Sequence, residues 1–322
     1  MKNTRVLVTG GSGFIGHHLV RRLLAEGCKV GVVVRYANAM HNERLRSIYD
    51  SLHVIEADIR NRGALAAIGE FAPQIVFHLA AYNHVGDSFT QVEECFDVNA
   101  KGTANVFDIA AAASAQKFIY ASTSEVYGHQ TGVPFVETAM PEPISPYAIT
   151  KYAGELYCRL KQRTEQRTST IVLRPFNAYG PYQGAKAIIP ELITACLLGR
   201  PIRTTPGEQT REFNFVEDLV EGMILAMRTE KRIEGVINLG ASEEIKIRDL
   251  VLKIAKLTDT KSKIEIGALP YRPTEVWRMY CDNTRARETL GWRPKVTIEQ
   301  GLKLTIEWYR TFLREHGELS AS

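Results

Sequence analysis

The chain of 322 residues carries 40 Lys and Arg side chains against 36 Asp and Glu, a formal net charge of +4. So small an excess gives no support to a nucleic-acid partner. Five cysteines without a C-x-x-C pair argue against a disulfide framework and a zinc site, and no apolar run reaches the length of a membrane span. We therefore expect a cytoplasmic protein of one large or two closely associated domains, without a metal and without a nucleic-acid or membrane partner.

Three glycines stand between the first predicted strand and the first predicted helix. Gly11, Gly13 and Gly16 fit the pattern G-x-G-x-x-G, whereas Gly10, Gly13 and Gly16 fit G-x-x-G-x-x-G. In either register the turn lacks Cβ atoms, so backbone N–H groups at the helix N-terminus can approach a pyrophosphate. Because a strand precedes the run and a helix follows it, the run predicts a dinucleotide-binding site.

Strand and helix patterns alternate through the first half of the chain. Several strand patterns are apolar on successive residues, as in strands that are covered on both faces. The alternation predicts right-handed crossovers and an α/β fold with a doubly wound parallel sheet of the Rossmann type. Strands are predicted over 6–8, 30–34, 54–55, 75–79, 118–121 and 170–173, and helices from Ile15 onward and over 63–71, 92–114 and 147–162.

The pattern changes after Arg174, where Gly and Pro become frequent. Helices are still predicted over 188–198, 216–227 and 247–257 and after Thr297, and a strand over 236–239 could return to the main sheet. We expect a dinucleotide-binding domain over residues 1–176 and a smaller substrate-binding domain over 177–322, interleaved with the first near 213–240.

The ends of the second and third predicted strands bear on the cofactor. In NAD-binding versions of this fold an acidic residue about 20 positions after the glycines binds the ribose 2′-hydroxyl. Arg35 stands there instead. An arginine can hold a 2′-phosphate, so we expect NADP or NAD with a slight preference for NADP; alternatively, Arg35 stacks on the adenine or faces solvent. Asp58 could accept a hydrogen bond from the adenine amino group, or cap a helix that begins near Gly63.

A second motif, Tyr147-Ala-Ile-Thr-Lys151, lies on a predicted helix. Residues four apart share a helix face, which places the phenol beside the ammonium group. A nearby cation favours the phenolate, so we expect Lys151 to lower the pKa of Tyr147 and to make it a usable base near neutrality.

Together these motifs resemble those of the extended short-chain dehydrogenases/reductases, and in particular the nucleotide-sugar epimerase/dehydratase group. The resemblance covers essentially the whole chain. Matching segments are TGGSGFIG at 9–16, DIR at 58–60, HLAA at 78–81, NAKGT at 99–103, YAITK at 147–151, RPFN at 174–177, LGWRP at 290–294 and GL at 301–302.

The resemblance implies a nucleotide-diphosphate sugar bound between the two domains, and a homodimer formed by the helices at about 92–114 and 147–162. It also implies a set of cofactor contacts beyond the glycines. That set comprises Gly10, Gly13, Phe14, Ile15, Gly16, Arg35, Asp58, Ile59, Leu79, Ala80, Ala81, Tyr147 and Lys151.

The segment Ser122-Thr123-Ser124-Glu125 is where the members of this group differ. The resemblance implies that Ser122 or Thr123 binds the sugar hydroxyl that is oxidised at C4. Sugar 4-epimerases generally need no more than that hydroxyl-binding residue, Tyr and Lys, whereas 4,6-dehydratases carry a Glu in the next turn. Once C4 is a ketone the C5 proton is acidic, and Glu125 could remove it while the C6 hydroxyl leaves as water.

Ser124 departs from one branch of the resemblance. Many dTDP-glucose dehydratases have Asp at this place to protonate the departing oxygen, whereas GDP-mannose dehydratases have Thr-Ser-Glu. UDP-glucuronate decarboxylases have a similar segment. The acid for water loss is therefore either Ser124 or Glu125, and the segment is compatible with decarboxylation.

Substrate contacts are expected mainly from the second half of the chain. The stretch 174–190 resembles that of dehydratases that act on nucleotide-linked N-acetylglucosamine in legionaminic acid pathways. There the resemblance places Asn177 near the sugar or its phosphate and Gln183 and Lys186 along the diphosphate. It further implies anion contacts from Arg211 and Arg272 and a substrate contact from His84.

The residues together predict a nucleotide-sugar 4,6-dehydratase, a lyase with an internally recycled nicotinamide cofactor. The alternatives are a 4-epimerase, a decarboxylase of a nucleotide-linked uronic acid, and a catalytically silent NADP-binding protein. The last is disfavoured because Tyr147 and Lys151 are both present. No residue selects among UDP, GDP, dTDP and CDP.

Overall fold

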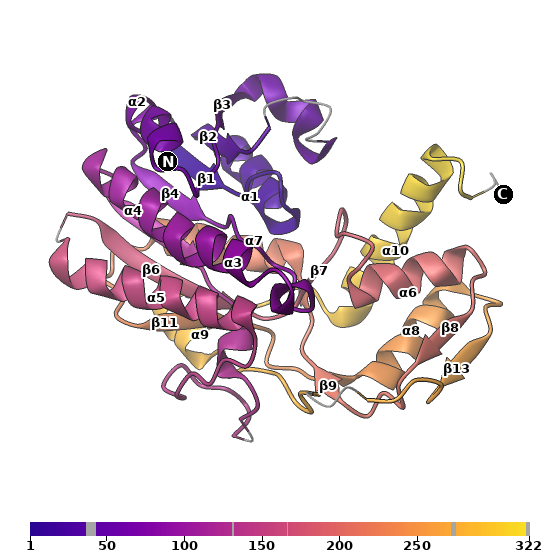
Figure 1. Ribbon diagram of the computed structural model, residues 1–322. Helices are drawn as coiled ribbons and strands as arrows, with labels where there is room; N and C mark the ends of the chain where they lie inside the picture. The colour runs from indigo at the N-terminus through magenta and orange to yellow at the C-terminus, as the bar shows by residue number, and fades with distance from the viewer. Residues whose placement is uncertain (37–42, 131, 166, 272–274, 320–322) are drawn as a thin grey trace.

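The computed structural model describes residues 1–36, 43–130, 132–165, 167–271 and 275–319. Its centre is a seven-stranded sheet with the strand order β11-β6-β5-β4-β1-β2-β3 (Figure 1). Every neighbouring pair is parallel, which confirms the predicted α/β doubly wound sheet. The strands are β1 (Arg5–Thr9), β2 (Lys29–Val34), β3 (Leu52–Glu56), β4 (Ile75–His78), β5 (Lys117–Ala121), β6 (Ser169–Pro175) and β11 (Val236–Leu239).

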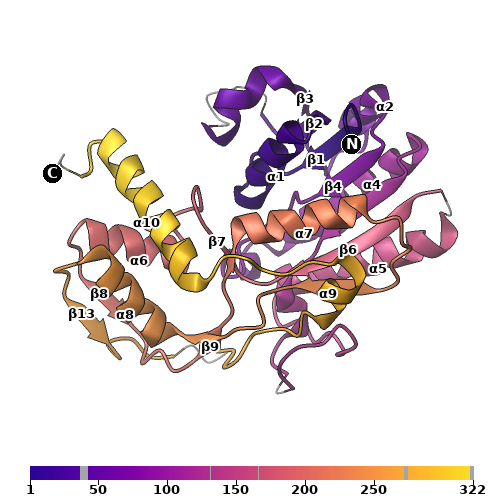
Figure 2. The same ribbon diagram turned by 180° about the vertical axis from the view of Figure 1, so that it is seen from behind.

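Helices cover both faces of this sheet, as its apolar strands require. One face packs against α2 (Ala67–Phe71), α4 (Gly102–Ala112) and α5 (Pro146–Thr164). The opposite face packs against α1 (Phe14–Ala25), α7 (Val216–Arg228) and α9 (Thr284–Leu290). Figure 1 shows α4 and α5 in front of the sheet, and Figure 2 shows α7 and α9 on the other side.

A separate apolar cluster holds the smaller, second part of the molecule together. Its helices are α6 (Ile188–Leu197), α8 (Ile247–Thr258) and α10 (Ile298–Glu315), and in both views they lie to one side of the sheet (Figures 1 and 2). Short strands join this part: β8 (Ile202–Thr204) pairs with β13 (Ile264–Ile266), and β9 (Thr210–Arg211) pairs with β12 (Ile245–Lys246).

The chain passes between the two parts more than once. After β9 it forms β10 (Asn214–Phe215), which pairs with β7 (Ala178–Tyr179). It then enters α7 and β11, and β11 pairs in parallel with β6 in the main sheet. This exchange supports the proposal of two domains that interleave near residues 213–240.

Helix boundaries follow local sequence signals. Helix α5 begins where Ser145 accepts a hydrogen bond from the backbone N–H of Ala148 and Pro146 occupies the first turn. Thr297 and Gln300 form a capping box before α10. The helix predicted over 92–114 is instead divided into α3 (Val92–Phe96), a π-helical turn over 97–101, and α4. The prediction missed a 3₁₀ helix (Glu43–Ser51) and α9.

Gly154 allows α5 to lie close to strand β5. The Tyr120 hydroxyl donates to the Lys151 carbonyl at 3.1 Å, and a Cβ at Gly154 would lie 2.3 Å from that hydroxyl oxygen. We expect Gly154→Ala to lower the unfolding free energy by roughly 1–3 kcal/mol, because the helix must move away from the strand. Chemical denaturation measures this loss. Gly69→Ala in α2 is the control, since a Cβ there meets nothing within 4 Å, and an equal loss in both variants would contradict the argument.

Candidate active site

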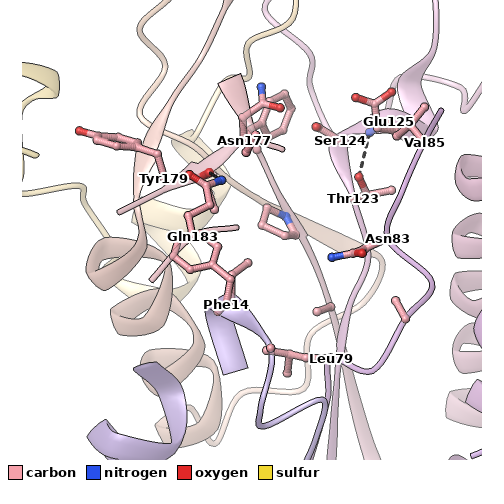
Figure 3. Close-up of a pocket in the computed structure, with 18 of the residues that line it drawn as sticks. Phe14, Leu79, Asn83, Val85, Thr123, Ser124, Glu125, Asn177, Tyr179 and Gln183 are labelled. Atoms are coloured by element: carbon pink, nitrogen blue, oxygen red, sulfur yellow. Dashed lines mark hydrogen bonds between the residues drawn. The ribbon is translucent and has the colours of Figure 1, made fainter. Parts of the chain in front are cut away.

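A cavity of about 420 Å³ lies at the carboxyl ends of β1, β4, β5 and β6, the place where doubly wound sheets bind their ligands. Its other wall comes from the second part of the molecule. Figure 3 shows Asn177, Tyr179 and Gln183 opposite Thr123, Ser124 and Glu125. The predicted site residues that line it are Gly10, Gly13, Phe14, Ile15, Gly16, Leu79, Ala81, Ser122, Thr123, Ser124, Glu125, Tyr147, Lys151, Asn177 and Gln183.

The glycine run forms the floor of this cavity in one of the two predicted registers. Gly10, Gly13 and Gly16 line it, whereas Gly11 does not and instead faces Val32 and Val20. A Cβ at Gly16 would lie 2.1 Å from the Gly10 carbonyl oxygen, so the helix can begin this close to the turn only with glycine. These residues fit a pyrophosphate, because they leave the backbone bare at a helix N-terminus.

Arg35 and Asp58 lie at the far end of the predicted cofactor site and do not line the cavity. Arg35 is exposed just after β2, and its charge helps lower the pKa of Asp58, although hydrogen bonds from Arg60 are the main cause. Both Asp58 oxygens accept from the Arg60 guanidinium. The helix-cap alternative for Asp58 is wrong: Asn61 accepts from the backbone N–H of Gly63 at 3.0 Å.

Two further predicted cofactor contacts, Ala80 and Ile59, contact other parts of the protein in this structure. The Ala80 N–H donates to the Thr9 hydroxyl at 3.2 Å, and Ile59 is buried and packs against Gly102. Neither residue lines the cavity. His78 behaves as a core residue, since it is fully buried between the hydroxyls of Thr9 and Thr103.

Thr123 and Glu125 are held by a short 3₁₀ helix (Ser124–Tyr127) that follows β5. The Thr123 side chain caps this helix by accepting from the Glu125 N–H at 3.2 Å (Figure 3). Glu125 is half-buried in the cavity wall. Desolvation raises the pKa of its carboxyl group, and the charge of Arg211 partly offsets this. A carboxyl group with a raised pKa can both accept and return a proton near neutrality.

The predicted lowering of the Tyr147 pKa is wrong in this structure. Burial raises the pKa of Tyr147 to about 12, and a hydrogen bond with the Thr123 side chain only partly opposes this. Lys151 is engaged elsewhere: its ammonium donates to the Ala121 carbonyl at 2.5 Å and lies 4.4 Å from the centre of the Tyr120 ring. Burial lowers the pKa of Lys151 to about 8. The negative charge of Glu125 also raises the pKa of Tyr147, and both residues line the same cavity.

Ser122 lines the cavity, but its hydroxyl group is committed to a protein partner. It donates a very short hydrogen bond to Glu155 of α5. Glu155 in turn accepts from Arg174 at 2.8 and 2.6 Å, and both charged side chains are buried. Of the two hydroxyls predicted to bind O4, Thr123 is therefore the one that a substrate could reach without breaking this network.

The predicted substrate contacts divide into two sets. Asn177 and Gln183 line the cavity, where Asn177 donates to the Glu212 carbonyl and Gln183 donates to the Ala178 carbonyl. His84 and Lys186 are exposed and outside the lining. Arg211 also lies outside it, paired with Glu275 at 2.8 Å. Arg272 falls outside the described residues.

Sequence reasoning missed several residues that line the same cavity. Asn83 and Val85 lie on the loop after β4, and Figure 3 shows Asn83 near Thr123 and Val85 near Glu125. Tyr179 and Phe213 come from the second part of the chain. The position of the Asn83 loop just beyond the segment HLAA was a usable signal, because loops at the carboxyl ends of parallel strands face the ligand. No local pattern marks Phe213.

The described residues form neither a metal-binding cluster nor a membrane-spanning helix. Among them, no group of three or more His, Cys, Asp or Glu side chains is arranged to hold a metal ion. Within the same ranges, no helix combines the length and the apolar character that a bilayer crossing requires.

Comparison with known proteins places this site in context. The chain is 34% identical over 319 residues to dTDP-D-glucose 4,6-dehydratase of Bos taurus, with 95% of this chain and 88% of the relative covered. It is 33% identical to UDP-glucose 4-epimerase of Mycolicibacterium smegmatis (95% and 98% covered). It is 34% identical to UDP-N-acetyl-alpha-D-glucosaminuronate decarboxylase of Bacillus cytotoxicus (95% and 98% covered).

Solved structures of nucleotide-sugar enzymes have the same fold as this chain. The UDP-glucose 4-epimerase of Thermotoga maritima in complex with UDP-glucose superposes with a TM-score of 0.89 at 32% identity, covering 96% of this chain and 100% of the other. MoeE5 in complex with UDP-glucuronic acid and NAD gives a TM-score of 0.85 at 32% identity with the same coverage. The family model described as GDP-mannose 4,6 dehydratase matches residues 7–305. The chain therefore belongs to the GDP-mannose 4,6-dehydratase family of extended short-chain dehydrogenases/reductases.

Proposed function

We propose that this protein is a nucleotide-sugar 4,6-dehydratase that converts a nucleotide-diphosphate hexose to its 4-keto-6-deoxy derivative. The observation that carries the proposal is the shared cavity of Tyr147, Thr123 and Glu125. Oxidation at C4 needs a base at O4, and water loss needs a second base at C5. Tyr147 and Glu125 are two proton-transfer groups of different kinds that line one cavity.

Each residue has one task in this scheme. Tyr147 takes the proton from O4 in its phenolate form, which burial disfavours in this structure, while Thr123 holds that oxygen. Gly10, Gly13 and Gly16 would hold the pyrophosphate of a nicotinamide cofactor, which would supply the hydride-accepting and hydride-donating chemistry for C4 and C6. Glu125 removes the C5 proton, and the C6 hydroxyl leaves as water after protonation by Glu125 or Ser124. The group that gave up this proton regains one from solvent, and once the hydride is on C6, Glu125 returns a proton to C5. The raised pKa of Glu125 supports this double duty.

The relatives supply the competing functions. A 4-epimerase, as in the relative from Mycolicibacterium smegmatis, would use Tyr147 and Thr123 and leave Glu125 without a chemical task. A decarboxylase, as in the relative from Bacillus cytotoxicus, would lose carbon dioxide from a uronic acid. All three begin with oxidation at C4, so the common first step cannot separate them.

Product analysis separates the three functions. We would incubate the protein with NAD or NADP and a panel of UDP-, GDP-, dTDP- and CDP-linked hexoses and uronic acids, and follow product mass. The dehydratase gives a product lighter by one water molecule, the epimerase conserves mass, and the decarboxylase loses carbon dioxide. A product of unchanged mass or a loss of carbon dioxide would contradict the dehydratase proposal.

The cofactor preference rests on Arg35. Its exposed side chain lies near Asp58 at the sheet edge, where an adenosine ribose would be bound. If Arg35 pairs with a 2′-phosphate, Arg35→Ala should weaken NADP binding by roughly ten- to a hundredfold and NAD binding by much less. Isothermal titration with both cofactors measures this. Arg62→Ala is the control for general charge loss, and equal weakening of NADP and NAD in Arg35→Ala would defeat the preference.

We further propose that the protein forms a homodimer through α3 and α5. These helices pack side by side and share an exposed apolar surface on which Val92 and Phe96 of α3 lie with Ile149, Leu156 and Leu160 of α5. A second copy of the chain would cover this surface. We expect Leu156→Glu/Leu160→Glu to sediment as a monomer, whereas Leu252→Glu, on an exposed residue of α8, should leave the dimer intact. Identical sedimentation of all three proteins would contradict this interface.

The predicted cytoplasmic location stays a proposal. The five cysteines are all buried and unpaired, which is typical of proteins from reducing compartments.

A further inference from the structure

A buried network ties the helix of the catalytic pair to the ends of two central strands. Glu155 lies one turn beyond Lys151 on α5 and is fully buried. It accepts from Ser122 at the end of β5 and from the Nε and Nη2 atoms of Arg174 in β6. A single carboxylate therefore joins three elements that meet at the cavity.

Burying this ion pair costs free energy, so a contribution to stability does not by itself explain why the pair is present. Two buried charges lose their hydration, and replacing such a pair with apolar side chains is often neutral or stabilising. The pair is also incompletely satisfied, since the Nη1 atom of Arg174 is buried without a hydrogen-bond partner among the described residues. The Arg174 guanidinium lies 4.7 Å from the centre of the Tyr127 ring, which provides an apolar contact on one side.

The network also acts on Lys151, through its hydrogen-bond acceptor and through its charge. Its ammonium is buried and donates to the carbonyl of Ala121, the residue directly before Ser122. Because Glu155 holds Ser122, it fixes the strand end that supplies this acceptor. Because Glu155 is also a nearby negative charge, it favours the charged form of Lys151.

We propose that Glu155 is a positioning residue for the catalytic pair, which fixes the Ala121–Ser122 strand end beneath Lys151 and keeps Lys151 charged. The inference rests on the proposed function only in taking Tyr147 and Lys151 as the pair that oxidises C4. It also explains why the Ser122 hydroxyl faces a protein carboxylate instead of the cavity.

Lys151 faces several other titratable groups, and Glu155 is the strongest of those that favour its charge. Burial is the largest influence and lowers the Lys151 pKa to about 8, while Glu155 leads the groups that raise it. The Lys151 charge in turn helps lower the pKa of His78, although burial is the main cause. The groups that face Lys151 are Glu155 and Cys158 of α5, Cys95 of α3, His78 of β4 and Tyr120 of β5.

The test is a titration of the Lys151 amine by ¹⁵N NMR in lysine-labelled full-length protein, with Lys151→Met to assign the signal. Glu155→Gln removes the charge and keeps the shape of the side chain, so the Lys151 pKa should fall by about one unit or more. Glu155→Asp keeps the charge and should restore most of the wild-type value. Asp108→Asn, which removes a carboxylate on α4 that pairs with Lys161, is the matched control and should leave the Lys151 titration unchanged.

A Lys151 pKa that is unchanged in folded Glu155→Gln would overturn the proposal. If that variant unfolds because Arg174 is left unpaired, Glu155→Gln/Arg174→Gln removes both charges. A smaller downward shift is then expected, because Glu155 acts more strongly on Lys151 than Arg174 does and loss of the Arg174 cation opposes only part of the change. Failure of both variants to fold would assign Glu155 to stability alone and would equally overturn the proposal.

A second readout follows C4 oxidation in a single turnover. A fall in the Lys151 pKa should lower the oxidation rate of Glu155→Gln about tenfold more at pH 8.5 than at pH 6.5, because the cation is lost earlier as pH rises. A uniform loss at both values indicates a structural role and contradicts the proposal. If the wild-type protein oxidises no nucleotide sugar, the proposed function fails, while the NMR titration still decides the role of Glu155.

Discussion

Glu125→Gln should abolish dehydration and leave C4 oxidation in place. The amide keeps the size of the side chain and its place in the short helix after Thr123, but it cannot take the C5 proton. Loss of a positioned acid–base group typically costs about 10²–10⁴-fold in rate. We therefore expect the release of 4-keto-6-deoxy product and the exchange of C5 hydrogen with deuterated solvent to fall by that factor, measured by mass spectrometry and NMR.

The control for this variant is Glu142→Gln, which changes an exposed carboxylate and should leave both rates unchanged. In Glu125→Gln the absorbance of the reduced cofactor should still appear and should persist, because the hydride has no route to C6. Wild-type C5 exchange in Glu125→Gln would show that another group removes the C5 proton and would remove Glu125 from the chemistry. Absence of C5 exchange in the wild-type protein would favour the epimerase.

Tyr147→Phe should stop the reaction one step earlier, at C4. Phenylalanine fills the same space on α5 but has no oxygen to accept the O4 proton, so reduced cofactor should form about 10²–10⁴-fold more slowly. Single-turnover absorbance measures that step. The expected loss is shared by the dehydratase, the epimerase and the decarboxylase, so this variant tests the common site and not the choice among them.

Tyr157→Phe gives a matched comparison on the same helix. Its hydroxyl donates to Asp108 at 2.6 Å, away from the cavity lining, so its removal should affect stability and not turnover. Retention of a wild-type oxidation rate in Tyr147→Phe would show that another group accepts the O4 proton.

The part of the site that sequence predicts well is the part built from local spacing. Gly16 and the pair Tyr147–Lys151 are recognisable because a helix start and a four-residue helical interval fix their geometry. The predicted strands of the main sheet differ from the observed ones only at their ends, and β11 was placed correctly at residues 236–239. The short strands β7, β8, β9, β10, β12 and β13 were not predicted.

Contacts between distant segments could not be predicted in the same way. No local pattern around Ser122 predicts that its hydroxyl donates to Glu155, which lies 33 positions further along the chain. The Tyr147 pKa was misjudged for a related reason. The pattern places Lys151 on the same helix face, but it says nothing of the burial that raises this pKa or of the Ala121 carbonyl that accepts a hydrogen bond from Lys151. Likewise, the pairing of Arg211 with Glu275 joins residues 64 positions apart.

The parallel pairing of β11 with β6 has a consequence for experiments that cut or exchange the chain. A fragment that ends at residue 176 would lack β11 and would leave β6 as a bare sheet edge, which invites aggregation. It would also lose α7, whose apolar side chains cover one face of the sheet. Chimaeras that swap specificity between relatives should therefore keep residues 216–239 with the amino-terminal partner and exchange only the flanking segments.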